Sequence, residues 1–98
     1  KADVVLVNPT HVAVAIKYDA NVSDAPIVVA KGGDNICEKI KDTARAWGVP
    51  IVRKPPLARA VFNTVKIDEP IPEHLFVAVA EVLAMIYRIR RRKQLANG

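Results

Sequence analysis

Two runs of apolar, mostly β-branched residues constrain the fold most. The first covers residues 4–7, the second covers residues 12–18, and only an Asn-Pro-Thr-His tetrapeptide separates them. β-Branched residues favour strands, and Asn, Pro and Thr favour turns, so this spacing predicts two strands joined by a tight turn. Both runs are apolar at successive positions, which is typical of strands covered on both faces. An α/β protein is therefore expected.

Glycine and aspartate set the bounds of the next two elements. Residues 26–30 form a third apolar run, which predicts a strand ended by Gly32 and Gly33. Asp34 is expected to cap a helix that closes at Gly48. Apolar residues recur at helical spacing within this helix and are expected to face the core or its edge. They are Ile36, Ile40, Ala44 and Trp47.

The second half of the chain predicts one more strand and two more helices. Residues 49–53 read as a short strand, and residues 55–62 read as a short helix because two prolines suit its first turn. Pro72 begins a long third helix that runs to about Arg92. The order is β-β-β-α-β-α-α. It predicts one domain over residues 1–98, of the α/β class, with a small four-stranded mixed sheet flanked by helices.

The composition limits the classes of function. With 98 residues, 51% of them apolar, the chain can build one core. Its single cysteine, Cys37, excludes an internal disulfide and is expected to be a buried structural thiol. No metal site and no cofactor are expected. No apolar run reaches the ~20 residues of a membrane-spanning helix, so the chain as given is expected to be soluble. Because it does not begin with Met, we expect it to be part of a longer protein.

Basic residues are concentrated near the carboxyl end. The net charge is +5, and five of the fifteen basic residues lie between Arg88 and Lys93, which predicts a basic helical tail over about residues 88–98. The other ten basic residues balance the ten acidic ones. A cationic helix end suits anionic lipid or a nucleic acid, and a nucleic-acid-binding module is the alternative function. The neutral body and the few aromatic residues favour a solvated helix end instead.

The Asn8-Pro9 step has a reactive interpretation beside its role in a turn. Pro9 has no N–H, so its nitrogen cannot attack the Asn8 side chain, which closes the usual deamidation route. The Asn8 carboxamide nitrogen can instead attack the Asn8 carbonyl carbon, form a succinimide and release Pro9 as a new amino terminus. Thr10 could orient the turn. His11 could carry a proton, or could simply begin the second strand.

Five segments occur in a fixed order along nearly the whole chain. They are residues 7–18 with Asn-Pro-Thr-His, residues 26–32, residues 48–51, residues 56–60, and residues 71–72 with 80–84. Together they resemble the FlhB and YscU family of type III secretion export-switch proteins. The segments Val-Ala-Lys-Gly and Pro-Pro-Leu-Ala-Arg-Ala resemble the flagellar branch more than the injectisome branch.

The resemblance implies a cytoplasmic domain that follows a membrane domain absent from this chain, at the cytoplasmic face of the bacterial inner membrane. It implies one self-cleavage between Asn8 and Pro9, with Thr10 and His11 completing the motif, no turnover of an external substrate, and a switch in the class of exported protein. The implied partners are other export-gate components, export substrates, a hook- or needle-length control protein and the protein's own membrane domain, but no nucleic acid.

The long third helix is apolar at nearly every position from residue 75 to residue 86. Such a helix is buried all round or presents an apolar stripe to a partner. One stripe is expected to face the sheet. It comprises Leu75, Val79, Val82 and Ile86. The neighbouring stripe, with Ala80 and Leu83, is either more core or a shallow groove for an apolar segment of an export substrate, rimmed by Ala25 and Pro26.

Overall fold

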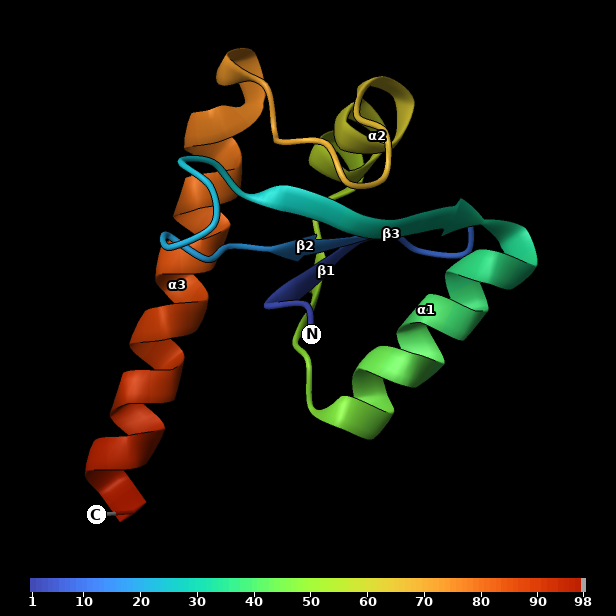
Figure 1. Cartoon of the computed structure of the whole chain (residues 1–98). Helices are drawn as coiled ribbons and strands as arrows, with labels where there is room; N and C mark the ends of the chain where they lie inside the picture. Colours follow the sequence, from blue (N-terminus) through green and yellow to red (C-terminus); the bar gives the residue numbers. More distant parts are fainter. Residues whose placement is uncertain (98) are drawn as a thin grey trace.

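The fold is a four-stranded mixed sheet with helices on both faces, seen in a computed structural model that describes residues 1–97 (Figure 1). Along the chain the elements are β1 (Val4–Asn8), β2 (Val12–Lys17), β3 (Ile27–Gly33), α1 (Asp34–Trp47), β4 (Ile51–Arg53), α2 (Pro55–Thr64) and α3 (Glu73–Asn97). The strand order in the sheet is β3-β2-β1-β4. β2 pairs antiparallel with β1 and β3, and β4 pairs parallel with β1. The predicted fold class and element order are confirmed.

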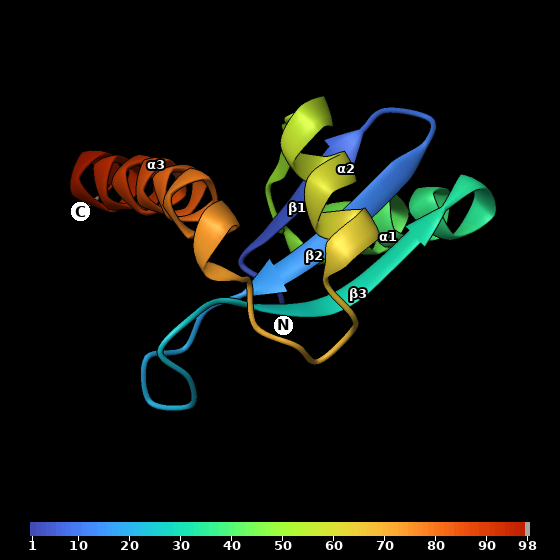
Figure 2. The same ribbon diagram turned by 90° about the horizontal axis from the view of Figure 1, so that it is seen from above.

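The sheet separates two cores. α1 covers one face, and α2 and α3 lie on the other (Figure 2). β1 supplies both cores, because its successive side chains point to opposite faces: Val4 and Leu6 face α2 and α3, whereas Val5 and Val7 face α1. All four are at most 4% exposed. This double burial explains why the strand is apolar at every position.

The prediction that the glycines end the third strand is confirmed at Gly33, although β3 includes both Gly32 and Gly33. A methyl group at Gly32 would overlap the Ile36 side chain, so the glycine lets the first turn of α1 pack directly on the strand. Asp34 is not the cap that was expected. Gly33 is the N-cap residue, and no side chain bonds to this end of the helix.

The buried stripe of α1 differs from the predicted one. Ile36 is 54% exposed, so its expected place in the core is wrong. Trp47 is 67% exposed and lies at the edge of the core rather than within it. Cys37 and Ala44 are the buried residues of this helix, and Ile40 packs beside them. Their side chains are small and lie against the alanines of β2, which lets the helix sit close to the sheet. The buried face of α1 is therefore the one that carries Cys37 and Ala44, and it is turned away from Ile36 and Trp47.

The stripe of α3 expected to face the sheet does so, since Val79, Val82 and Ile86 are buried. The groove interpretation of the neighbouring stripe is wrong for Leu83. This residue is 3% exposed and belongs to the core shared with α2, while Ala80 is half-buried. α2 contacts α3, and both helices contribute side chains to the core that contains Leu83. Beyond Ile86, the basic residues from Arg88 to Lys93 are exposed.

The burial of Leu83 leads to a stability prediction. Leu83→Lys places an unpaired charge in the core and should lower the free energy of unfolding by about 3–5 kcal/mol. The matched control is Ala84→Lys, one residue further along α3 at an exposed position, which should change it by less than about 0.5 kcal/mol. Urea denaturation measures both values. Equal stability of the two variants would contradict the placement of Leu83.

Candidate functional site

The Asn-Pro-Thr-His tetrapeptide forms the tight turn between β1 and β2. The backbone N–H of His11 donates a hydrogen bond to the carbonyl oxygen of Asn8 at 3.0 Å, which closes a four-residue turn. Asn8 ends β1 and pairs with Val12 across the hairpin. The predicted turn is confirmed.

The backbone of this turn is unusual at Thr10, whose φ angle is 67°. Proline fixes φ of the second turn residue at about −65°, and a positive φ at the third residue then makes a type II turn. Glycine or asparagine normally occupies that third position, because a β-branched residue is strained there at a cost of order 1–3 kcal/mol. The strain lies one residue after Pro9, next to the bond that the chemistry would break.

Main-chain contacts hold both ends of the turn. The Val7 carbonyl accepts a hydrogen bond from the Lys54 N–H at 3.1 Å, just after β4. The His11 carbonyl accepts one from the Asp34 N–H at 3.1 Å, at the start of α1. The bond between Asn8 and Pro9 is thus fixed from both sides by elements distant in the sequence.

The Asn8 carbonyl carbon is the atom that an intramolecular nucleophile would attack. A hydrogen bond to its oxygen already polarises this carbonyl group. The His11 N–H that closes the turn points at its oxygen, where negative charge would develop in a tetrahedral intermediate. A backbone donor in this place acts like one arm of an oxyanion hole. This donor was missed by reasoning from residue types, which considered only the imidazole of His11.

The four side chains differ in their environment. Asn8 and Pro9 are half-buried, whereas Thr10 and His11 are exposed. Within residues 1–97, none of these side chains makes a hydrogen bond, so the imidazole of His11 and the Asn8 carboxamide are not joined. The turn brings the four residues together through the backbone.

The second predicted site lies away from this turn. Pro26 precedes β3, and its carbonyl accepts a hydrogen bond from the Ile71 N–H at 2.8 Å, just before α3. The loop that carries Ala25 is therefore tied to the segment that leads into α3. Pro26 is buried and Ala25 is half-buried. Of the four residues predicted to bind a partner, Ala25 and Ala80 thus keep partial exposure.

A polar contact that the sequence did not reveal anchors the start of β1. Asp3 accepts a hydrogen bond from the Tyr18 N–H at 2.8 Å through its carboxylate. The same side chain lies 3.8 Å from the Arg90 guanidinium of α3. Burial and the nearby Asp3 carboxylate raise the pKa of the Tyr87 phenol on the same helix. No sequence signal pairs residues 87 positions apart, so only the fold reveals this contact.

Cys37 is fully buried, as predicted. Burial raises the pKa of its thiol, and the carboxylates of Glu38 and Asp34 add to this rise against the opposing effect of Lys41. A higher pKa means that less of the reactive thiolate is present at neutral pH. Within residues 1–97, no group of three His, Cys, Asp or Glu side chains is placed to hold a metal ion.

The Cys37 environment predicts poor reactivity. In the folded protein at pH 7, a maleimide should label Cys37 at least about a hundredfold more slowly than it labels the urea-unfolded chain, because the thiol is buried and mostly protonated. Mass spectrometry over time measures both rates. Labelling of the folded protein at the unfolded rate would show that the thiol is accessible.

Comparison with known proteins identifies the family. The model of the FlhB HrpN YscU SpaS family matches residues 1–86. The chain belongs to this family. The flagellar biosynthetic protein FlhB of Bacillus subtilis is 46% identical over 92 residues, which cover 94% of this chain and 26% of that protein. The chain spans about a quarter of the length of the curated relatives it matches.

Solved structures agree with this assignment. The crystal structure of the cytoplasmic domain of FlhB from Shewanella putrefaciens matches with a TM-score of 0.90 at 50% identity, covering 95% of this chain and 71% of that one. A mutated EscU C-terminal domain matches with a TM-score of 0.85 at 27% identity, covering 88% of this chain and 86% of that one. The higher identity to FlhB agrees with the resemblance to the flagellar branch. Nucleic-acid binding, the alternative function, finds no support in these relatives.

Proposed function

We propose that this chain is the cytoplasmic part of a flagellar type III export protein, that it cuts itself once between Asn8 and Pro9, and that the cut lets the export apparatus change the class of protein it accepts. Membership of the FlhB HrpN YscU SpaS family supports the role in export. The observation that carries the self-cleavage is the turn itself, in which the Asn8 carbonyl is held and polarised by the His11 N–H.

The proposed reaction needs no external reagent for its first step. The Asn8 carboxamide nitrogen forms a bond to the Asn8 carbonyl carbon, and the bond from that carbon to the Pro9 nitrogen breaks. One proton leaves the carboxamide nitrogen, and the Pro9 nitrogen gains one as it departs as a secondary amine. Asn8 is left as a succinimide, which water then opens. A carboxamide is a weak nucleophile, so a held geometry has to supply much of the rate.

The sheet explains why such a cut would leave the domain assembled. β1 ends at Asn8 and lies between β2 and β4, with side chains in both cores. Leaving the sheet would expose those side chains and break the hydrogen bonds of two ladders. The cut would instead free the end of β1 and the new amino terminus at Pro9, which changes the local surface without unfolding the protein.

Two groups of His11, its backbone N–H and its imidazole, could act in this reaction. Its backbone N–H contacts the Asn8 carbonyl oxygen, while its imidazole is exposed and unbonded within residues 1–97. We assign the main contribution to the backbone donor, with the proton carried by solvent or by the imidazole. Thr10 contributes by holding the strained backbone angle of the turn.

Membership of the family supports the partners and the location that we propose. We place the protein at the cytoplasmic face of the bacterial inner membrane, attached to a membrane domain and in contact with other export-gate components and a hook- or needle-length control protein. Within residues 1–97, no helix has the length and apolar character needed to cross a bilayer. The half-buried Ala25 and Ala80 remain the proposed contact points for an export substrate, with buried Pro26 and Leu83 supporting them.

The cleavage proposal predicts two fragments. Denatured protein should contain a chain that begins at Pro9, whereas native protein should keep residues 1–8 bound. Asn8→Ala removes the nucleophile and should yield one intact chain. Pro9→Ala keeps the nucleophile but restores an N–H, and should slow the reaction or divert it to deamidation. Intact-mass spectrometry under denaturing and native conditions measures each species. Cleavage of Asn8→Ala at the parent rate would overturn the mechanism.

The role assigned to His11 predicts a small effect of its side chain. His11→Ala keeps the backbone N–H, to which we assign the main contribution, and should slow cleavage by no more than about tenfold. Loss of a general acid or base would instead slow it by about 10²–10⁴. The cleavage rate is followed from the first appearance of the fragment beginning at Pro9. A decrease of a hundredfold or more in a variant that folds normally would assign the proton transfer to the imidazole.

A further inference from the structure

An apolar groove of about 520 Å³ lies between α1 and the sheet, at the end of the domain opposite the Asn8 turn. Its floor is formed by small and branched side chains of the strands and of the helix. They include Val5, Ala15, Ala30, Ile40, Ala44 and Val49. This part of the α1 core is open to solvent.

The rim of the groove carries a large exposed aromatic side chain. Trp47 is 67% exposed although it is the largest apolar residue of the chain, and Val29 of β3 is 36% exposed on the opposite rim. An exposed apolar surface next to a concave site is typical of a protein contact site. Tryptophan is also enriched among the residues that contribute most to binding energy at interfaces.

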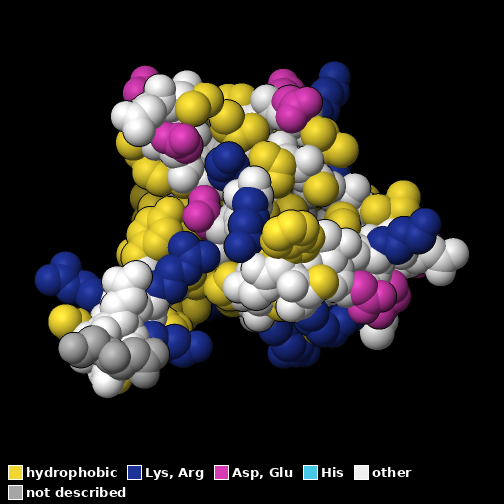
Figure 3. All heavy atoms as spheres, turned by 60° about the horizontal axis from the view of Figure 1, so that its bottom comes forward, with side chains coloured by type: hydrophobic (Ala, Val, Ile, Leu, Met, Phe, Trp, Pro, Cys, Tyr) yellow, Lys and Arg dark blue, Asp and Glu magenta, His cyan; other side chains and the backbone are white. Residues whose placement is uncertain are grey.

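The two charged residues that line the groove are both lysines. Lys1 and Lys39 line it, and the Lys1 ammonium lies 5.8 Å from the centre of the Trp47 ring. Figure 3, which brings this end of the molecule forward, shows Lys and Arg side chains next to hydrophobic ones on this face. Neither lysine forms an ion pair within residues 1–97.

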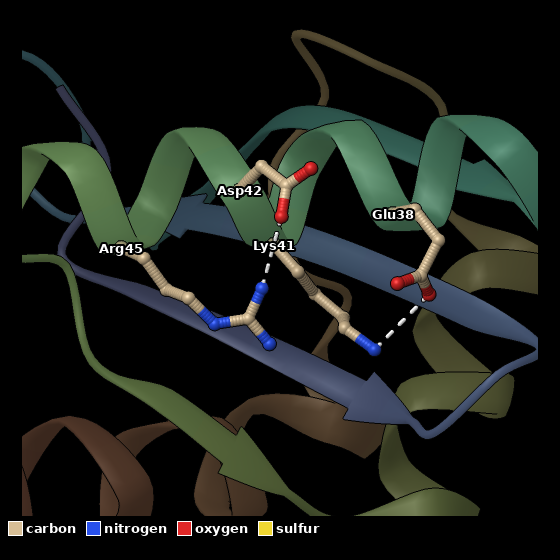
Figure 4. Close-up of polar contacts among 4 residues, drawn as sticks. All are labelled: Glu38, Lys41, Asp42 and Arg45. Carbon is tan, nitrogen blue, oxygen red and sulfur yellow. Dashed lines mark hydrogen bonds and ion pairs between the residues drawn. The ribbon is translucent and has the colours of Figure 1, made fainter.

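The acidic residues in the middle of α1 do not neutralise Lys1 and Lys39, because these acidic residues form ion pairs with other basic residues of the same helix. Glu38 forms an ion pair with Lys41 at 3.1 Å, and Asp42 forms one with Arg45 at 3.0 Å, as Figure 4 shows. Both pairs join residues one turn apart on the helix. The groove therefore combines an apolar floor with two cations that are free to meet carboxylates of another molecule.

We propose that this groove binds a short peptide segment of another protein in which large apolar residues are flanked by carboxylates. Leu or Val side chains would fill the floor against Trp47, and the flanking Asp or Glu residues would meet Lys1 and Lys39. Opposite charges at the rim would raise the association rate and select the acidic segment over a neutral one. A second copy of this chain is a poorer occupant, since two molecules of charge +5 repel each other.

This proposal stands apart from the cleavage, because the groove and the Asn8 turn lie at opposite ends of β1. The single tryptophan makes binding measurable without a label, since Trp47 is part of the rim. The probe is the blocked peptide acetyl-Asp-Leu-Val-Leu-Asp-amide. Its matched control is the same peptide with both Asp residues replaced by Asn, which has the same shape without the charges.

The experiment titrates each peptide into the protein and follows Trp47 fluorescence. The acidic peptide should shift the emission to shorter wavelength in a saturable manner, and the neutral peptide should bind at least about fivefold more weakly. Lys39→Glu should weaken binding of the acidic peptide by about tenfold. Lys93→Glu, which makes the same change of net charge on the tail of α3, should alter it by less than about twofold.

Three results would overturn the proposal. The first is no fluorescence change up to about 1 mM peptide, the weakest affinity of interest. The second is equal binding of the two peptides, or equal loss in Lys39→Glu and Lys93→Glu, which would indicate a general charge effect. The third is a dimer of the free chain in sedimentation equilibrium that Lys39→Glu dissociates, which would make a second copy the occupant.

Discussion

The burial of β1 on both faces and both edges is the constraint on which the rest of the structure depends. Val4 and Leu6 point into one core, Val5 and Val7 into the other, and the strand pairs with β2 on one side and β4 on the other. Asp3 fixes the entry to the strand through Tyr18 and Arg90. A strand with no free surface resists removal, so the turn at its end can change while the sheet remains intact.

The turn after β1 combines a structural role with the proposed chemical role in the same residues. Pro9 suits the second position of a tight turn and also blocks deamidation, so one ring serves both purposes. The hydrogen bond from His11 to the Asn8 carbonyl closes the turn and also polarises the carbon that the proposed reaction attacks. The geometric and the reactive interpretations of this tetrapeptide are therefore compatible, because the proposed reaction would depend on the turn.

The sequence predicts what local periodicity determines and fails where packing decides. Apolar runs that do not alternate with polar residues identified the strands that are buried on both faces. Gly48 correctly marked the end of α1. Helical spacing could not show which of two adjacent apolar stripes of a helix is buried. Apolar residues occur on both sides of the buried stripe, so the spacing fits more than one of them. Ile36 was misplaced for this reason, and the choice between core and groove stayed open for Leu83. Their exposure depends on how close α1 approaches the alanines of β2 and on where α2 lies against α3.

The two faces of the sheet also differ for a geometric reason. Strands lie about 4.8 Å apart, so the outer strand axes of a four-stranded sheet are separated by about 14 Å. A helix with its side chains is about 10 Å wide and cannot cover that span alone. Within residues 1–97, α2 and α3 both pack on one face of the sheet, whereas α1 is the helix that packs on the other. The uncovered strip is the groove beside Trp47, and it follows from the element order, because only one helix within residues 1–97 lies on this side.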